Sequence, residues 1–359
     1  MTSLPYFPRQ AFAAANSCEG FKSYYGEVFS DGRTDRIYII KGGPGTGKSH
    51  FMKWVARRAR ERGYAVTEYL CSSDPASLDG IILTREGSPT LGLLDGTPPH
   101  AREPALPGVR EELVDLGAFW DPVILTAHRE EVAALVRKKS EAYGRAYACL
   151  RGAGSMDSLL DAMVEPLVDT DRLNALAARL LKGQPTLGFE AIPTLRRALS
   201  MTGRHTLHSF EETSAALLLA EDGYGLGYRL ASAMLVLSKE RGQRVMVSYD
   251  PLSPRKPDGL LYPDTGLCLL TGDGRPPEHI PVRTLSLRRF VDTEGLRAQR
   301  GELRHTARLR NTLTDTALRH MKAASEAHFE LERIYASAMD FKAKEAFTRD
   351  FCTRLFGDP

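Results

Sequence analysis

Residues 36–52 read RIYIIKGGPGTGKSHFM, and this stretch decides how the first half of the chain folds. Residues 36–40 are apolar and mostly β-branched, which is typical of a buried parallel strand. Residues 42–49 match the pattern G-x-x-x-x-G-K-[ST] at every fixed position, and a helix-forming run follows them. A strand, a glycine loop and a helix in that order predict a loop that binds phosphate groups.

The residues of this loop have separate expected roles in binding a nucleoside triphosphate. Its glycines allow backbone angles that turn several N–H groups toward one point, where the positive end of the following helix also acts. Lys48 is expected to reach the β- and γ-phosphates, and the Ser49 hydroxyl to ligate Mg²⁺. The predicted nucleotide-binding residues are those of the whole loop: Gly42, Gly43, Pro44, Gly45, Thr46, Gly47, Lys48 and Ser49.

Three polar residues after the loop are candidates for catalysis. Residues 91–95 (LGLLD) read as an apolar strand ending in Asp95, the pattern expected of a Walker B carboxylate that holds Mg²⁺ opposite Ser49. Asp74 follows another predicted strand, and it either positions a nucleophile or forms a turn. His100 either senses the γ-phosphate, or acts as an acid or base near neutral pH, or is a structural residue of a proline-rich turn.

The expected nucleotide is ATP, because the sequence contains no N-K-x-D motif that would read guanine. No glutamate follows Asp95, so the usual base of many ATPases is missing at that position.

The composition is that of a soluble globular protein long enough for two domains. The 359 residues are 42% hydrophobic and 26% charged, and their net charge of +3 argues against a dedicated nucleic-acid binder. The five cysteines are scattered, which is typical of reduced thiols in a cytosolic protein. Without a signal-peptide pattern or a membrane-length apolar run, the sequence predicts a cytoplasmic protein with no membrane partner.

The second half of the chain repeats landmarks of the first, beyond a glycine- and proline-containing linker at residues 182–194. Five landmarks recur 176 to 179 residues later: 61–63 at 240–242, 75 at 254, 79–80 at 258–259, 93–94 at 269–270 and 98–99 at 276–277. We therefore expect two tandem α/β units of three-layer α/β/α type with mainly parallel sheets, each followed by a helical extension. The predicted units are residues 1–183 and 184–359.

The second copy of the loop lacks the side chains that hold phosphate and metal. An alignment through the glycines at 223, 225 and 227 pairs Lys48 with Tyr228 and Ser49 with Arg229. It also puts the carboxylate of Asp222 where phosphate oxygens would lie, and like charges repel. The second half is therefore predicted to be a degenerate copy that has kept the fold and lost the nucleotide site.

A stripe of arginines occurs in the long helical tract predicted for residues 292–356. Its members share one helical face, because they are spaced three or four residues apart: Arg297, Arg300, Arg304 and Arg308. Such a face is either solvated, or inserts an arginine into the first unit's site, or binds a polyanion.

Four motifs occur together: GGPGTGKS at 42–49, CSSD at 71–74 followed by LDG at 78–80, LDGTPPH at 94–100, and SAMDF at 337–341. In this combination the chain resembles an uncharacterised family of bacterial tandem P-loop ATPases, found mostly in Gram-positive organisms. The resemblance covers essentially the whole chain, and it implies two P-loop units and ATP binding without naming a substrate. Many members keep a loop lysine in the second half as well, and Tyr228 departs from that pattern.

Taken together, these patterns predict a Mg²⁺-dependent ATPase that binds ATP and ADP at one intact site, while the second half scaffolds or regulates. Lys48 would stabilise the transferring phosphoryl group, Ser49 and Asp95 would hold Mg²⁺, and Asp74 or His100 would orient the nucleophile. One alternative is a small-molecule or nucleotide kinase whose helical appendage closes over the site. Another is a non-enzymatic interaction protein that ATP switches between shapes.

Overall fold

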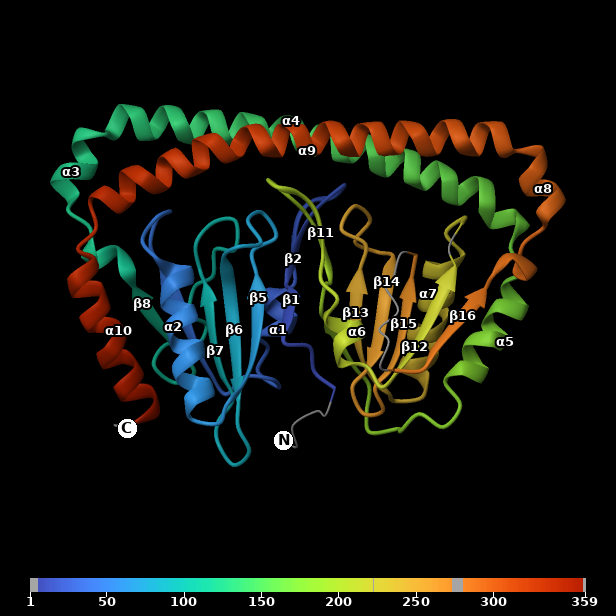
Figure 1. The fold of residues 1–359 in the computed structure, drawn as a ribbon, viewed down its shortest axis with the longest axis horizontal. Helices are drawn as coiled ribbons and strands as arrows, with labels where there is room; N and C mark the ends of the chain where they lie inside the picture. Colours follow the sequence, from blue (N-terminus) through green and yellow to red (C-terminus); the bar gives the residue numbers. More distant parts are fainter. Residues whose placement is uncertain (1–5, 222, 273–279, 358–359) are drawn as a thin grey trace.

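The computed structural model describes residues 6–221, 223–272 and 280–357. Asp222 and the landmark prolines at 276–277 lie outside these residues. Figure 1 shows two α/β units side by side, with two long helices running above both of them. The expected pair of α/β units is confirmed.

The first unit is built on a six-stranded sheet with the order β1-β5-β6-β7-β4-β8. Strand β6 runs antiparallel to both of its neighbours, and the other pairs are parallel. The strands are β1 (Gln10–Phe12), β4 (Arg36–Lys41), β5 (Ala65–Leu70), β6 (Leu78–Thr84), β7 (Leu91–Asp95) and β8 (Glu111–Asp115).

The second unit repeats this sheet strand for strand, in the order β9-β13-β14-β15-β12-β16. Here β14 is the antiparallel strand. The strands are β9 (Glu190–Pro193), β12 (Ala216–Glu221), β13 (Arg244–Tyr249), β14 (Pro257–Tyr262), β15 (Leu267–Thr271) and β16 (Val282–Ser286). Three of the five strand pairs in each sheet are parallel, as expected, but both sheets are mixed. The connections on either side of β6 and β14 are too short for a crossover helix.

Each unit carries one principal helix on its sheet, α2 (Lys48–Glu61) in the first and α7 (Leu226–Glu240) in the second. The opposite face of the first sheet packs on the short helix α1 (Tyr25–Val28) and neighbouring segments, through buried residues such as Phe29. The remaining small elements are hairpins β2 (Ala14–Ser17)–β3 (Gly20–Ser23) and β10 (Arg197–Ser200)–β11 (Gly203–Thr206), helix α6 (Ser209–Thr213), and 3₁₀ turns η1 (Leu116–Phe119), η2 (Glu165–Leu167) and η3 (Arg288–Phe290).

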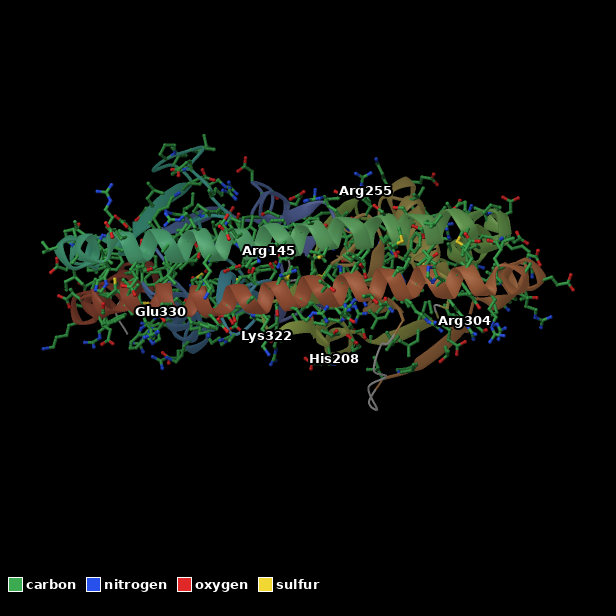
Figure 2. The ribbon with its side chains drawn as sticks, turned by 90° about the horizontal axis from the view of Figure 1, so that it is seen from above. Arg145, His208, Arg255, Arg304, Lys322 and Glu330 are labelled. Atoms are coloured by element: carbon green, nitrogen blue, oxygen red, sulfur yellow. The ribbon has the colours of Figure 1, made fainter. Side chains whose placement is uncertain are left out.

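A helical extension follows each sheet. The first consists of α3 (Pro122–Ala127), α4 (Arg129–Val164) and α5 (Thr170–Leu180), and the second of α8 (Thr293–Ala298), α9 (Arg300–Ser337) and α10 (Phe341–Phe356). Helices α4 and α9 lie antiparallel along the whole molecule, as the view from above shows in Figure 2. Among the described residues no helix is both long and apolar enough to cross a membrane.

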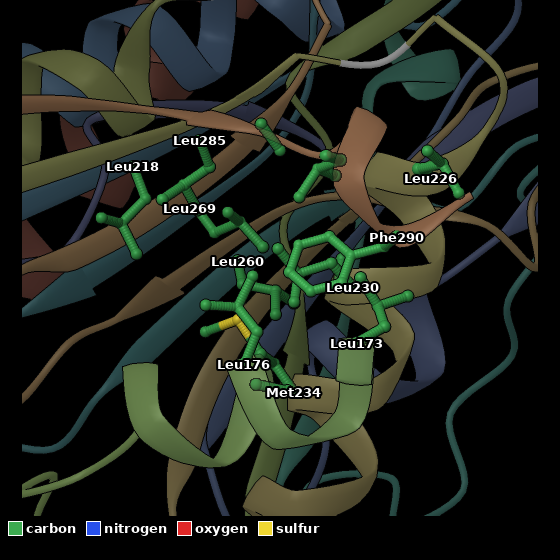
Figure 3. Packing of buried hydrophobic residues seen from close by; sticks show 14 of the residues in the cluster. Leu173, Leu176, Leu218, Leu226, Leu230, Met234, Leu260, Leu269, Leu285 and Phe290 are labelled. Atoms are coloured by element: carbon green, nitrogen blue, oxygen red, sulfur yellow. The ribbon is translucent and has the colours of Figure 1, made fainter. Parts of the chain in front are cut away.

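The end helices are exchanged between the two units. With 36 residues, α4 is about 54 Å long, so it carries α5 away from its own sheet to the second unit. There Leu173 and Leu176 of α5 pack against Leu230 and Met234 of α7 (Figure 3). In the same way α9 carries α10 to the first unit, where the Phe351 ring lies 5.1 Å from that of Phe51 on α2. Each half therefore completes its hydrophobic core with a helix from the other half.

This exchange predicts that a cavity in α10 destabilises the first unit. The Phe351→Ala substitution is expected to lower the free energy of unfolding by about 3–5 kcal/mol, because Phe351 is buried among the residues of α2 and β4. Urea unfolding followed by tryptophan fluorescence measures this, since both tryptophans, Trp54 and Trp120, lie in the first half of the chain.

Phe329→Ala is the matched control, because Phe329 is an exposed phenylalanine on α9. Its expected cost is about 0.5 kcal/mol or less. Equal effects of the two substitutions on the tryptophan signal would contradict the exchange.

Candidate functional site

The glycine loop at residues 42–49 presents a set of unpaired backbone donors. Gly45 and Gly47 have φ values of 71° and 79°, and Gly47 is the residue that precedes helix α2. Within the part of the chain that the structure describes, the N–H groups of Gly45, Thr46, Gly47 and Lys48 form no hydrogen bond. Four free donors at the N-terminus of a 14-residue helix form a place that suits an anion.

Helix α9 packs directly on this loop, which adds a second reason for its glycines. A Cβ on Gly43 would lie 2.8 Å from the Tyr335 ring, and one on Gly45 would collide with the backbone carbonyl of Glu332. Gly43 is not among the glycines with positive φ, so here the backbone does not use the conformational freedom expected of the loop glycines. At this position glycine is needed because the helix comes so close.

Lys48 and Asp95 are brought together by the sheet. Strands β4 and β7 are parallel neighbours, and Ile40 at the end of β4 pairs with Asp95. The Lys48 Nζ donates to the carbonyls of Gly42 at 3.0 Å and Gly43 at 2.9 Å, and it lies 3.6 Å from Asp95 Oδ2. Burial raises the pKa of Asp95 above its usual value, and the Lys48 ammonium opposes that shift. A cation therefore stabilises this carboxylate.

Ser49 lies in the first turn of α2, where its Oγ accepts a hydrogen bond of 2.9 Å from the Leu78 N–H. Ser49 offers a hydroxyl oxygen, and Asp95 offers a desolvated carboxylate. Mg²⁺ prefers oxygen ligands of these kinds in proteins. No group of three or more His, Cys, Asp or Glu side chains within the described ranges gathers as a metal site. The donor set fits a Mg²⁺ ion that takes its other ligands from phosphate oxygens and water.

Asp74 and His100 lie in different surroundings. Asp74 accepts from the Ser77 hydroxyl at 2.7 Å, which is the bonding of a turn former, and it also faces residues of α9. His100 is buried between the rings of Phe21 and Tyr25 and lies 3.0 Å from Asp79. Among the described contacts, none joins His100 to the loop.

A cluster on the two long helices faces the same site, and no sequence pattern pointed to it. Lys139 of α4 lies 3.1 Å from His328 of α9, and the carboxylate of Glu332 is one turn further along α9. Burial, and then the Lys139 charge, lowers the pKa of His328 to about 4. Burial and the nearby Asp74 raise the pKa of Glu332.

Lys344 is the most informative residue that the sequence analysis missed. It belongs to α10, it is only 3% exposed, and a Cβ on Gly47 would lie 2.7 Å from its Nζ. Its ammonium makes no hydrogen bond or ion pair with any residue that the structure describes; the ring of Phe341 lies 5.5 Å away. Burial lowers the pKa of Lys344, and Glu345 offsets part of that effect. A buried, unpaired cation therefore lies beside the free N–H groups of the loop.

The second loop is shorter than the sequence alignment assumed. Gly225, with φ of 72°, precedes α7, and three residues (222–224) separate it from strand β12. In the first unit, five residues (42–46) separate β4 from Gly47. Leu226 therefore occupies the place of Lys48, and the pairing of Lys48 with Tyr228 is corrected by two residues. The helix begins after its capping glycine in both units, so the helix start fixes the alignment better than the glycine spacing does.

Tyr228 and Arg229 hold the end of α4 instead of a phosphate. The Tyr228 hydroxyl donates to Asp161 at 2.8 Å, and Arg229 pairs with Glu165. These contacts fasten the long helix of the first repeat above the second loop, as α9 lies above the first.

Comparisons of the chain with protein-family models, with curated proteins and with solved structures find no match. The resemblance of its motifs to tandem P-loop ATPases therefore stays a prediction.

The buried ammonium predicts a substitution that stabilises the fold. Because the folded state lowers the pKa of Lys344 from 10.5, the charged form costs free energy at neutral pH. Lys344→Met is expected to raise the free energy of unfolding at pH 7 by about 1 kcal/mol or more. The gain shrinks as the pH rises through the folded-state pKa toward 10.5, because the wild-type lysine then loses its proton.

Urea unfolding at pH 7 and at alkaline pH measures this difference. Lys342→Met on the same helix is the control, since Lys342 is exposed and its replacement should change stability by about 0.5 kcal/mol or less. A loss of stability in Lys344→Met at pH 7 would contradict the assignment of an unpaired buried charge.

Proposed function

We propose that the chain binds ATP at the glycine loop of its first half and hydrolyses it. The observation that carries this proposal is the convergence of four free backbone N–H groups with the ammonium groups of Lys48 and Lys344 at the N-terminus of α2. Donors and cations arranged in this way stabilise a phosphate chain and the charge that develops on a transferring phosphoryl group. The neighbouring carboxylate of Asp95 then serves a metal ion that accompanies the nucleotide.

Mg²⁺, when bound with ATP, would neutralise charge on the phosphate oxygens. Ser49 and Asp95 would hold the ion, and Lys48 would leave the loop carbonyls of Gly42 and Gly43 to bind the phosphates. Before the ligand arrives, the Lys48 ammonium lies 3.6 Å from Asp95 and offsets part of the rise that burial causes in the pKa of this carboxyl group.

The acceptor of the phosphoryl group needs a base, and two carboxylates are suitably placed. Glu332 lies near both Lys48 and Asp74, and its raised pKa brings that carboxylate closer to the working range of a base. His100 is a weaker candidate because it is buried in the core beside Asp79. In an ATPase the acceptor is water, and in a kinase of the same design it is a substrate hydroxyl.

The packing of α9 on the loop favours a second candidate function, a protein that ATP switches between shapes. Tyr335 and Glu332 of α9 touch Gly43 and Gly45, and the same helix continues above the second unit. A nucleotide that displaces α9 from the loop would thus move the second unit as well. Slow hydrolysis that no metabolite stimulates, together with a change in shape on adding ATP, would favour this role over that of a kinase.

The Lys48→Ala substitution tests the proposal. It is expected to weaken ATP binding about 100-fold or more, because hydrogen bonds to charged groups contribute about 1.5–3 kcal/mol each and Lys48 would make more than one. Isothermal titration calorimetry with Mg²⁺ and a slowly hydrolysed ATP analogue measures the affinity. Phosphate release, compared with phosphoryl transfer to a panel of metabolites, then separates water from a hydroxyl as the acceptor.

Lys53→Ala is the matched control, because Lys53 is an exposed lysine one turn further along α2. It should bind the analogue like the unaltered chain. Unchanged affinity in Lys48→Ala would remove the glycine loop from consideration as the nucleotide site.

A further inference from the structure

A cavity of about 1020 Å³ lies in the second unit, on the side that faces the long helices. Its walls come from the degenerate loop at Gly223 and Gly225, from the ends of β14 and β15, and from α4, α8 and α9. It occupies the same position relative to the second sheet as the candidate nucleotide site does relative to the first.

Four arginines from η3, α8 and α9 line this cavity, and we name them the arginine wall: Arg288, Arg297, Arg300 and Arg304. All four side chains are exposed, and none of them forms an ion pair or hydrogen bond with a residue that the structure describes. Arg304 lies toward one end of α9 in Figure 2, far from Glu330 at the other end. Arg308, which shares the helical face in the sequence, is not part of the lining.

The carboxylates of the cavity already have partners elsewhere in the lining: Asp157, Asp161, Asp250 and Asp258. Lys256 lies 2.6 Å from Asp157 and 2.5 Å from Asp161. Arg197 lies 3.2 Å from Asp250 and 2.5 Å from Asp258. Among the lining residues that the structure describes, these acids therefore leave little negative charge to balance the arginine wall, and positive charge is in excess.

We propose that this cavity binds a compact ligand that carries several phosphate groups. One guanidinium group can bind two phosphate oxygens at once, so four of them lining one cavity suit a di- or triphosphate better than a single anion. The second loop cannot supply the usual lysine, because Leu226 stands in its place. The arginines therefore take over the role that a loop lysine would have.

The ligand is either a nucleotide or another phosphorylated metabolite, which share the phosphate chemistry. Tyr224 lines the same cavity and is 38% exposed, so its ring is available to stack on a base. If ATP binds more tightly than inorganic tripolyphosphate, the ligand is a nucleotide. If the two affinities are equal, the ligand is another phosphorylated metabolite.

The test uses the full chain with Lys48→Ala, so that the glycine loop of the first half does not contribute to binding. Calorimetry with inorganic tripolyphosphate is expected to show binding that weakens with salt. Adding Arg300→Ala and Arg304→Ala should weaken it about tenfold or more, because both guanidinium groups would lose their charged hydrogen bonds to phosphate oxygens. Adding Arg308→Ala instead should leave the affinity within about twofold, because Arg308 lies outside the cavity.

Three results would overturn the proposal: no binding of tripolyphosphate to the Lys48→Ala chain, an equal loss on replacing Arg308, or a preference for a single-stranded oligonucleotide over tripolyphosphate. The last would mark the arginine wall as a nucleic-acid surface. Because the first loop is disabled throughout, these results do not depend on whether that loop binds ATP.

Discussion

The antiparallel packing of α4 against α9 is the constraint on which the rest of the structure depends. Each helix is long enough to pass over both units, so each carries its own end helix to the opposite core. Two contacts, which the internal repeat relates to each other, fix the register of α4 against α9. Lys139 contacts His328 near one end of the two helices, and Arg310 contacts Asp157 near the other. The two halves consequently share cores and cannot be separated at the linker without removing a helix from each.

The same arrangement makes the two loops different although their scaffolds are alike. α10 presents Lys344 to the first loop, whereas α5 presents the apolar Leu173, at the equivalent position, to the core of the second unit. An unpaired buried ammonium costs folding free energy, and such a cost is expected where a residue serves a ligand. The second unit uses its polar residues to hold α4, and its positive charge lies on the arginine wall instead of the loop.

Local patterns were sufficient to predict the strands around the glycine loop, the tandem repeat and the strand that ends in Asp95. These features depend on short stretches of sequence and on the general rule that parallel strands end at one edge of a sheet. The antiparallel β6 was missed because a short connection decides its direction, and its apolar run looks the same in either orientation. The two-residue error in the second loop arose because glycines alone do not show where a helix begins.

The exchange of end helices was not predictable from one sequence, since helical periodicity tells which face is buried and not against which partner. Lys344 was missed for the same reason, although a signal was present. It lies three and seven residues before Phe347 and Phe351, on the face of α10 that the core buries. A lysine on an apolar helical face is worth noting when a phosphate site is expected elsewhere in the chain.

The most direct test of the account is a crystal structure of the chain with Mg²⁺ and a non-hydrolysable ATP analogue. The account predicts phosphates on the N–H groups of Gly45, Thr46 and Gly47, with Lys48 from the first half and Lys344 from the second both in contact with them. A nucleotide absent from this loop, or one bound there with Lys344 turned away, would contradict the claim that both halves build one site.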